Sequence, residues 1–274
     1  MGVWVSMGIL EMRFIMRRRG IFVAAALLGC AVSNAQITLT HNGSTVNIDE
    51  NNVRITNWVV DGADQVFENL WYFRDGDGGT ASLVSTIGAP SVTLFGSQGA
   101  EVVYQNSDLT VTINYFLQAN GDGSAANLAE QVTFATVLGI NLRLFQYDDF
   151  DVSGSAGGDT ATRLNSSTID QADMNFVETT GATPIPEFSE MGPFAALRTN
   201  ITGTSGYNLN TSAGSGIGES QSGDMTFAYQ WNRNLGTGGS LVLSTSKVAV
   251  VPEPATFAVL GLGALALLRR RRTK

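Results

Sequence analysis

The chain has 274 residues, of which 43% are hydrophobic and 15% are charged, and this excludes a disordered chain of low hydrophobicity. Its 31 glycines show no three-residue period, so a collagen-like fibre is excluded as well. The net charge of −8 hides an uneven distribution, because nine of the 16 basic residues lie in the two terminal segments.

The first segment has the layout of a secretory signal. Three arginines at 17–19 precede an apolar run over 21–32, which is followed by small residues typical of a cleavage site. We therefore expect residues 1–35 to be a signal peptide removed by signal peptidase, with the biological start at Met1 or at Met16. The residues ending in Cys30 also resemble a bacterial lipobox, so lipidation of this thiol stays open. Because the chain has one cysteine, a disulfide framework is excluded.

Residues 36–247 are predicted to form one folded domain made of strands. Apolar and polar side chains alternate over 109–118 and over 225–231, and this period of two is typical of half-buried strands. Clusters of Gly, Asp, Asn and Ser separate the strands as turns. Further strands are expected at 36–40, 45–48, 53–60, 65–73, 91–95, 101–105, 131–138, 140–147, 174–178 and 240–250. The pattern predicts an all-β, antiparallel β-sandwich of jelly-roll type with at most one short helix, around 188–198.

This domain is strongly acidic. It contains seven Lys and Arg residues against 22 Asp and Glu residues. Such a surface repels nucleic acid and anionic headgroups, so neither is expected as a partner.

An aromatic cluster lies within the strand predicted at 65–73. In Leu70–Phe73 the alternation of strand side chains sends Trp71 and Phe73 to one face and Tyr72 to the other, so one ring is expected to point outward. Trp71 and Tyr72 are therefore candidate ligand-binding residues, suited to stacking on a sugar.

An acidic cluster follows the strand predicted at 140–147. Asp148, Asp149 and Asp151 supply the hard oxygen ligands that Ca²⁺ prefers, and they are candidate calcium ligands. Neither this loop nor the one with Asp75 and Asp77 matches the EF-hand pattern. Aspartates that stabilise turns are the alternative for both loops. Apart from calcium, no cofactor is expected.

The residues that common catalytic sites need are scarce. His41 is the single histidine, and residues 36–247 contain no cysteine, which excludes zinc sites built from several histidines and cysteine proteases. No Gly-x-Ser-x-Gly motif is present. A glycosidase with paired carboxylates is still allowed, but the spacing of the acidic residues selects no pair. We therefore expect no catalytic residues and no enzymatic activity.

The C-terminal segment, 248–274, has three parts. Val251, Pro252, Glu253 and Pro254 precede an apolar stretch at 255–268, which as a helix reaches about 21 Å, short of the ~30 Å core of a bilayer. Arg269, Arg270, Arg271 and Arg272 follow and would snorkel to the headgroups on the cytoplasmic side. We interpret 255–268 as a transmembrane helix with these arginines as its topology anchor.

The segment from Val251 to the end resembles the PEP-CTERM sorting signal of Gram-negative bacteria that make extracellular polysaccharide. The resemblance implies processing near Pro252–Pro254 by exosortase, a membrane-embedded cysteine protease, after transient anchoring in the inner membrane. It says nothing about the domain at 36–247.

Together these features predict a bacterial protein that is exported to the cell envelope, the cell surface or the extracellular matrix. The leading hypothesis is a non-enzymatic secreted β-sandwich. The alternative is a carbohydrate-binding module that recognises extracellular polysaccharide, and a paired-carboxylate glycosidase is the third reading.

Overall fold

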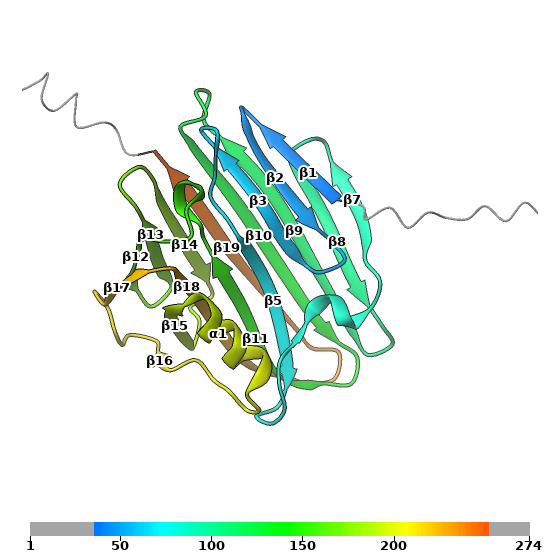
Figure 1. Ribbon diagram of the computed structural model, residues 1–274. Helices are drawn as coiled ribbons and strands as arrows, with labels where there is room; N and C mark the ends of the chain where they lie inside the picture. Colours follow the sequence, from blue (N-terminus) through cyan, green and yellow to red (C-terminus); the bar gives the residue numbers. More distant parts are fainter. Residues whose placement is uncertain (1–35, 252–274) are drawn as a thin grey trace, which may run out of the picture. The chain divides into compact units, whose positions relative to one another are not determined.

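The computed structural model describes residues 36–251. They form two antiparallel β-sheets packed as a sandwich, with one α-helix (Figure 1), and this confirms the predicted all-β class. Strands make up 60% and helices 8% of the described residues. The signal peptide and the transmembrane helix expected at 1–35 and 255–268 lie outside the described residues. No helix within 36–251 is long and apolar enough to span a membrane.

The first sheet, called sheet A, has ten strands. Eight of them lie side by side in the order β1 (Gln36–His41), β2 (Ser44–Asp49), β3 (Arg54–Val60), β5 (Glu68–Asp75), β11 (Ile140–Asp149), β18 (Met225–Leu235), β15 (Phe188–Pro193) and β16 (Thr211–Ser212). The short strands β4 (Ala63–Asp64) and β6 (Ser82–Leu83) pair with β3 and β5.

The second sheet, called sheet B, has nine strands. Their order is β17 (Ser220–Gly223), β12 (Asp159–Asn165), β13 (Thr168–Ala172), β14 (Val177–Thr183), β19 (Ser240–Val250), β10 (Ala125–Thr136), β9 (Leu109–Ala119), β8 (Gly99–Gln105) and β7 (Ser91–Phe95). Two 3₁₀ turns, η1 (Val84–Ile87) and η2 (Val152–Gly154), lie in the connections.

Local sequence fixes the tight hairpins at the start of sheet A. Asn42 and Gly43 between β1 and β2, and Asp61 and Gly62 between β3 and β4, all have positive φ. A two-residue turn with both φ values positive matches the right-handed twist of the flanking strands, and Asx-Gly pairs adopt it at little cost. These turns set the pairing of the strands, and with this pairing Val46 and the other inward-facing residues of β2 lie in the core.

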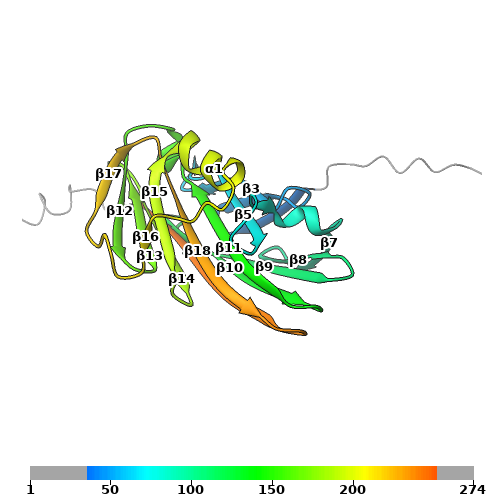
Figure 2. The ribbon, with the colours of Figure 1, turned by 90° about the horizontal axis from the view of Figure 1, so that it is seen from below.

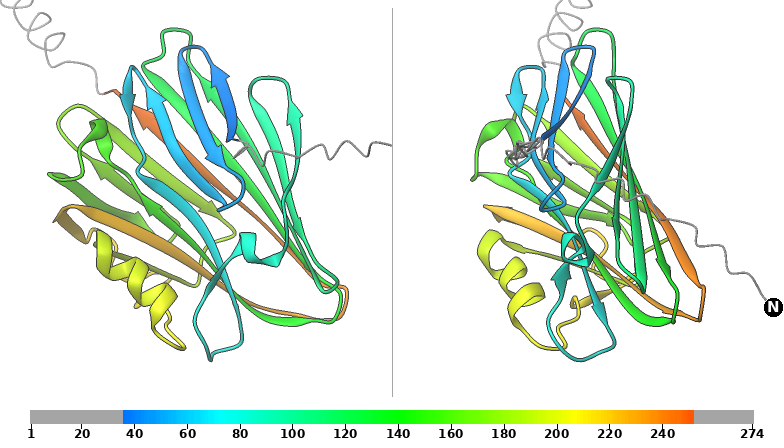
Figure 3. Two further views of the ribbon diagram at one scale, coloured as in Figure 1. Left: turned by 45° about the vertical axis from the view of Figure 1, so that its right-hand side comes forward. Right: turned by 90° about the vertical axis from the view of Figure 1, so that its right-hand side faces the viewer.

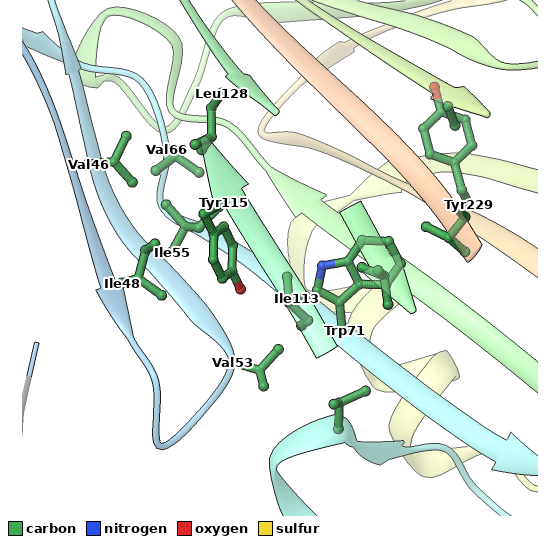
Figure 4. Packing of buried hydrophobic residues seen from close by; sticks show 14 of the residues in the cluster. Val46, Ile48, Val53, Ile55, Val66, Trp71, Ile113, Tyr115, Leu128 and Tyr229 are labelled. Carbon is green, nitrogen blue, oxygen red and sulfur yellow. The ribbon is translucent and has the colours of Figure 1, made fainter. Parts of the chain in front are cut away.

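The main core lies between the two sheets and is rich in large aromatic side chains. Val46, Ile55, Trp71 and Tyr115 meet there from both sheets (Figure 4). Trp71 and Trp231 stack with ring centroids 6.0 Å apart. Inward-facing and outward-facing side chains alternate along each strand, so the residues between the core residues lie on the outer face of each sheet.

A second, smaller cluster lies on the outer face of sheet A beneath the helix α1 (Phe194–Gly203). Leu197 and Ile201 of α1 belong to this cluster together with Tyr72 and Phe145 of sheet A. Figures 1 and 2 show the helix lying over the sheet. Viewed from the side, α1 lies on the side of sheet A away from sheet B (Figure 3). The single predicted helix exists, but it begins six residues later than expected, because Phe188–Pro193 pairs with β18 as a strand.

Candidate functional site

Three aspartates meet at the end of β11. Asp149 lies opposite Thr226 in the pairing of β11 with β18, and the same register extended by two residues brings Asp151 opposite Asp224. One carboxylate oxygen from each of the three residues lies within 4.8 Å of the others. The cluster contains two of the predicted calcium ligands, together with Asp224, which sequence spacing did not indicate.

Asp149 is the least solvated member of this cluster. It is 1% exposed, and neither of its carboxylate oxygens has a hydrogen-bond partner. Burial, followed by the nearby charges of Asp151 and Glu68, raises the pKa of Asp149 to about 8. The nearest arginine charge, on Arg198, pairs with Glu68 at 2.7 Å.

Asp148, the remaining predicted ligand, points the other way. It lies in the interior between the sheets, where Asn69 donates a hydrogen bond to it at 2.6 Å. Successive strand residues face opposite sides of a sheet, so Asp148 and Asp149 cannot serve one site. The structure therefore does not bring the three predicted ligands together.

The interior around Asp148 contains an enclosed charged network. The Lys247 ammonium lies 2.7 Å from Glu130 and 3.6 Å from Asp148, and Trp71 Nε1 donates to Glu130 at 2.7 Å. Burial alone would lower the pKa of Lys247, but the carboxylates of Asp148 and Glu130 reverse this and raise it. These buried groups link Trp71 and Asp148 of sheet A to Glu130 and Lys247 of sheet B in the interior of the sandwich.

The aromatic residues proposed for sugar stacking are buried as well. Trp71 is 0% exposed in the main core and Tyr72 is 2% exposed beneath α1. The two rings do point to opposite faces of sheet A, as alternation requires. The outward-facing ring is covered by the helix, so neither side chain reaches the surface.

The outer face of sheet B instead carries uncharged polar side chains around two shallow hollows. One hollow, of about 360 Å³, is lined by Ala129, Ser167, Thr168, Gly181, Ala182, Thr183, Ser244, Thr245 and Ser246. The other, of about 290 Å³, is lined by Gln118, Ala119, Asn120, Ala125, Ala126, Asn127 and Val248. They adjoin each other, because Ala129 pairs with Ser246 and Asn127 pairs with Val248.

Strand register explains the larger hollow. Phe116, Ala129, Ser246 and Gly181 form one row across β9, β10, β19 and β14. Ala129, Ser246 and Gly181 are small, and they line this hollow. Phe116 continues the row as the pairing partner of Ala129, and its side chain is 50% exposed. Amides and hydroxyls offer both donors and acceptors, so the face suits a neutral, hydroxyl-rich ligand.

The predicted processing residues lie at the end of the described chain. Val251 is the last described residue, and its backbone N–H donates to the Ser124 carbonyl at 2.9 Å. Pro252, Glu253, Pro254 and the four arginines at 269–272 lie outside the described residues.

Comparison with protein-family models identifies the tail. Residues 250–272 match the PEP-CTERM protein-sorting motif. The chain carries a PEP-CTERM sorting signal. This confirms the resemblance seen in the sequence, and it implies sorting by exosortase and export to the cell envelope or surface. No curated protein matches the sequence of the chain.

Solved structures share the fold of the domain. A bacterial glucoamylase complexed with acarbose superposes with a TM-score of 0.59 at 10% identity over 84% of this chain, which spans 36% of the glucoamylase. A putative aldose 1-epimerase from Escherichia coli K12 gives 0.54 at 8% identity, over 79% of this chain and 99% of its own. A galactose 1-epimerase from Lactobacillus acidophilus gives 0.52 at 8% identity, over 79% and 94%.

These likenesses correct one expectation from the sequence. The prediction of a non-enzymatic protein was wrong, because the fold is one that sugar-converting enzymes use. The sequence lacks the familiar catalytic motifs, but this absence does not exclude an active site formed by residues from several separate strands.

Proposed function

We propose that the exported domain binds carbohydrate on the outer face of sheet B. The observation that carries the proposal is the pair of adjoining hollows, one of them lined by Ala129, whose pairing partner Phe116 is exposed on the same face. Sugars present apolar C–H faces and polar hydroxyls, and an aromatic ring flanked by amides and hydroxyls complements both. The fold shared with the aldose epimerases and with part of a glucoamylase supports a carbohydrate ligand. Export by the PEP-CTERM route would present this face to extracellular polysaccharide.

Binding is tested with the full chain and soluble oligosaccharides of glucose and galactose, by isothermal titration calorimetry. Phe116→Ala is expected to raise Kd about tenfold, which corresponds to about 1.4 kcal/mol. Gly181→Gln should weaken binding as well by filling the hollow. It should not disturb the fold, because a Cβ at Gly181 meets nothing within 4 Å.

The matched control is Val242→Ala. Val242 is 51% exposed on β19, and neither it nor its pairing partner Thr133 lines a hollow, whereas Phe116 pairs with the lining residue Ala129. Equal losses in Phe116→Ala and Val242→Ala, or unchanged binding in Gly181→Gln, would contradict the proposed location.

A sugar-converting reaction is the second candidate, favoured by the likeness to whole epimerase chains. The residues that line the two hollows carry no ionisable side chain. Asn127, Val248, Thr179 and Asp170 form the neighbouring row across sheet B. Asp170 at the end of this row would be the carboxylate that transfers the proton. Anomer interconversion of glucose or galactose, followed by NMR, should then be lost in Asp170→Asn. A rate equal to the uncatalysed one in the wild type would remove this candidate.

A further inference from the structure

The aspartate cluster at the end of β11 has an unusual feature beyond its negative charge. The Asp149 carboxylate is shielded from water, yet both of its oxygens lack a hydrogen-bond donor. Burying a carboxylate without a partner is costly, and folded proteins compensate by pairing the charge or by coordinating a metal. Asp151 and Asp224 add two further carboxylates rather than a donor.

The nearby positive side chains do not supply the hydrogen bonds that the Asp149 carboxylate lacks. Arg198 lies 2.7 Å from Glu68, and Arg54 lies 3.5 Å from the other oxygen of the same carboxylate. The two arginines therefore serve Glu68, which leaves the oxygens of Asp149 without a hydrogen bond from either. A cation between the three aspartates would coordinate these oxygens and offset the negative charge of the cluster.

We propose that Asp149, Asp151 and Asp224 bind a Ca²⁺ ion. Ca²⁺ bonds to carboxylate oxygens at about 2.3–2.6 Å, so ligand atoms around one ion lie up to about 5 Å apart. The three carboxylate oxygens, within 4.8 Å of one another, fit this span. Asp224 is exposed and Asp151 is partly exposed, so the ion has a path from solvent and room for water ligands.

The ion would join two distant parts of the chain. Asp149 ends β11 and Asp151 directly precedes η2. Asp224 links β17 to β18, and its backbone carbonyl accepts a hydrogen bond from the first N–H of α1, that of Phe194, at 3.1 Å. Binding at this point would stabilise the end of sheet A and the base of α1. The site is independent of the proposed sugar face, which lies on sheet B, so either proposal can fail without the other.

The test is a calcium titration of the full chain after treatment with EDTA and dialysis. We expect one Ca²⁺ per chain, with a Kd of about 0.1–1 mM, the range of extracellular calcium modules. Saturating Ca²⁺ should raise the Tm by about 2–4 °C. Asp224→Asn should weaken binding by at least about tenfold, because it removes one of three charged ligands. Because Asp224 is exposed, the substitution should leave the fold intact.

Asp61→Asn is the charge-matched control, since Asp61 is an exposed aspartate in the β3–β4 turn and lies outside the cluster. It should bind Ca²⁺ as the wild type does. Asp149→Asn is the second variant, and its readout is the change of Tm on adding Ca²⁺ rather than the Tm itself. Either of two results would overturn the proposal: no Ca²⁺ binding by the wild type at about 1 mM, or equal binding by the wild type and Asp224→Asn.

Discussion

At the scale of single residues, Glu178 on β14 shows how burial controls a charge. The side chain is 0% exposed, and Thr180 donates one hydrogen bond to it at 2.7 Å, while the other oxygen has no partner. Desolvation raises the pKa of Glu178 well above 4.5. The folded protein therefore holds this proton more tightly than the unfolded chain does.

The stability of the protein should accordingly depend on Glu178 and on pH. Between 4.5 and the raised pKa, unfolding releases the proton, so the free energy of unfolding falls as the pH rises, by at most about 1.4 kcal/mol per pH unit. In Glu178→Gln this contribution is absent, so the loss of stability with rising pH should be shallower. Urea unfolding at a series of pH values above 4.5 measures the difference.

The control for this measurement is Glu101→Gln, which removes a partly exposed carboxylate from β8 of the same sheet. Its pH dependence should run parallel to that of the wild type. Parallel curves for Glu178→Gln and the wild type would contradict the predicted role of the buried carboxyl.

At the scale of secondary-structure elements, α1 depends on tertiary packing. It has no side-chain N-cap, and its two buried residues, Leu197 and Ile201, cover the outer cluster of sheet A. Leu197→Ala should lower the free energy of unfolding by about 3 kcal/mol, since it leaves a cavity between the helix and the sheet. Thr199→Ala, at an exposed position of the same helix, should change it by about 0.5 kcal/mol or less. Chemical denaturation of both variants checks the prediction, and similar losses would argue against docking through Leu197.

The strands differ in how well the sequence predicts them. Ser240–Val250 was predicted with its observed bounds, because apolar and polar residues alternate along its whole length. The strands β12 and β13 were missed, since Thr, Asn, Asp and Gln dominate them and mask the alternation. The strand expected at 174–178 is displaced to 177–183, and Met174 is 94% exposed. Strand propensity alone cannot show that a polar segment forms a strand by pairing with the strands beside it.

The candidate sites depended on contacts that no local pattern contains. Phe116 alternates with the apolar residues of its strand, but the hollow lined by its partner Ala129 also requires Gly181, 65 positions after Phe116 in the sequence. Asp224 joins Asp149 through the register of β11 with β18. A sequence read as separate segments indicates which residue types are present, whereas the pairing of distant strands decides which of them meet.

At the scale of the whole molecule, the sorting signal begins directly where the folded domain ends. β19 pairs with β10 and β14 up to Val250, and the Val251 N–H is hydrogen-bonded to Ser124. A protease that recognises Pro252–Pro254 therefore has to act within a few residues of a folded sheet. Cleavage there would separate the acidic domain from the basic tail and leave a domain that is more acidic than the full chain.

Processing at this junction can be tested by mass spectrometry of the protein from its native host. Wild-type molecules should lack the basic tail, whereas replacement of Pro252, Glu253 and Pro254 by alanine should leave it attached and hold the protein in the membrane fraction. Thr273→Ala, beyond the matched motif at 250–272, is the control and should be processed normally. Intact wild-type tails in most molecules would contradict cleavage, and normal processing of the triple variant would mean that exosortase does not need this motif. Because the variant leaves β19 unchanged, a retained tail would report on recognition of the motif rather than on folding of the domain.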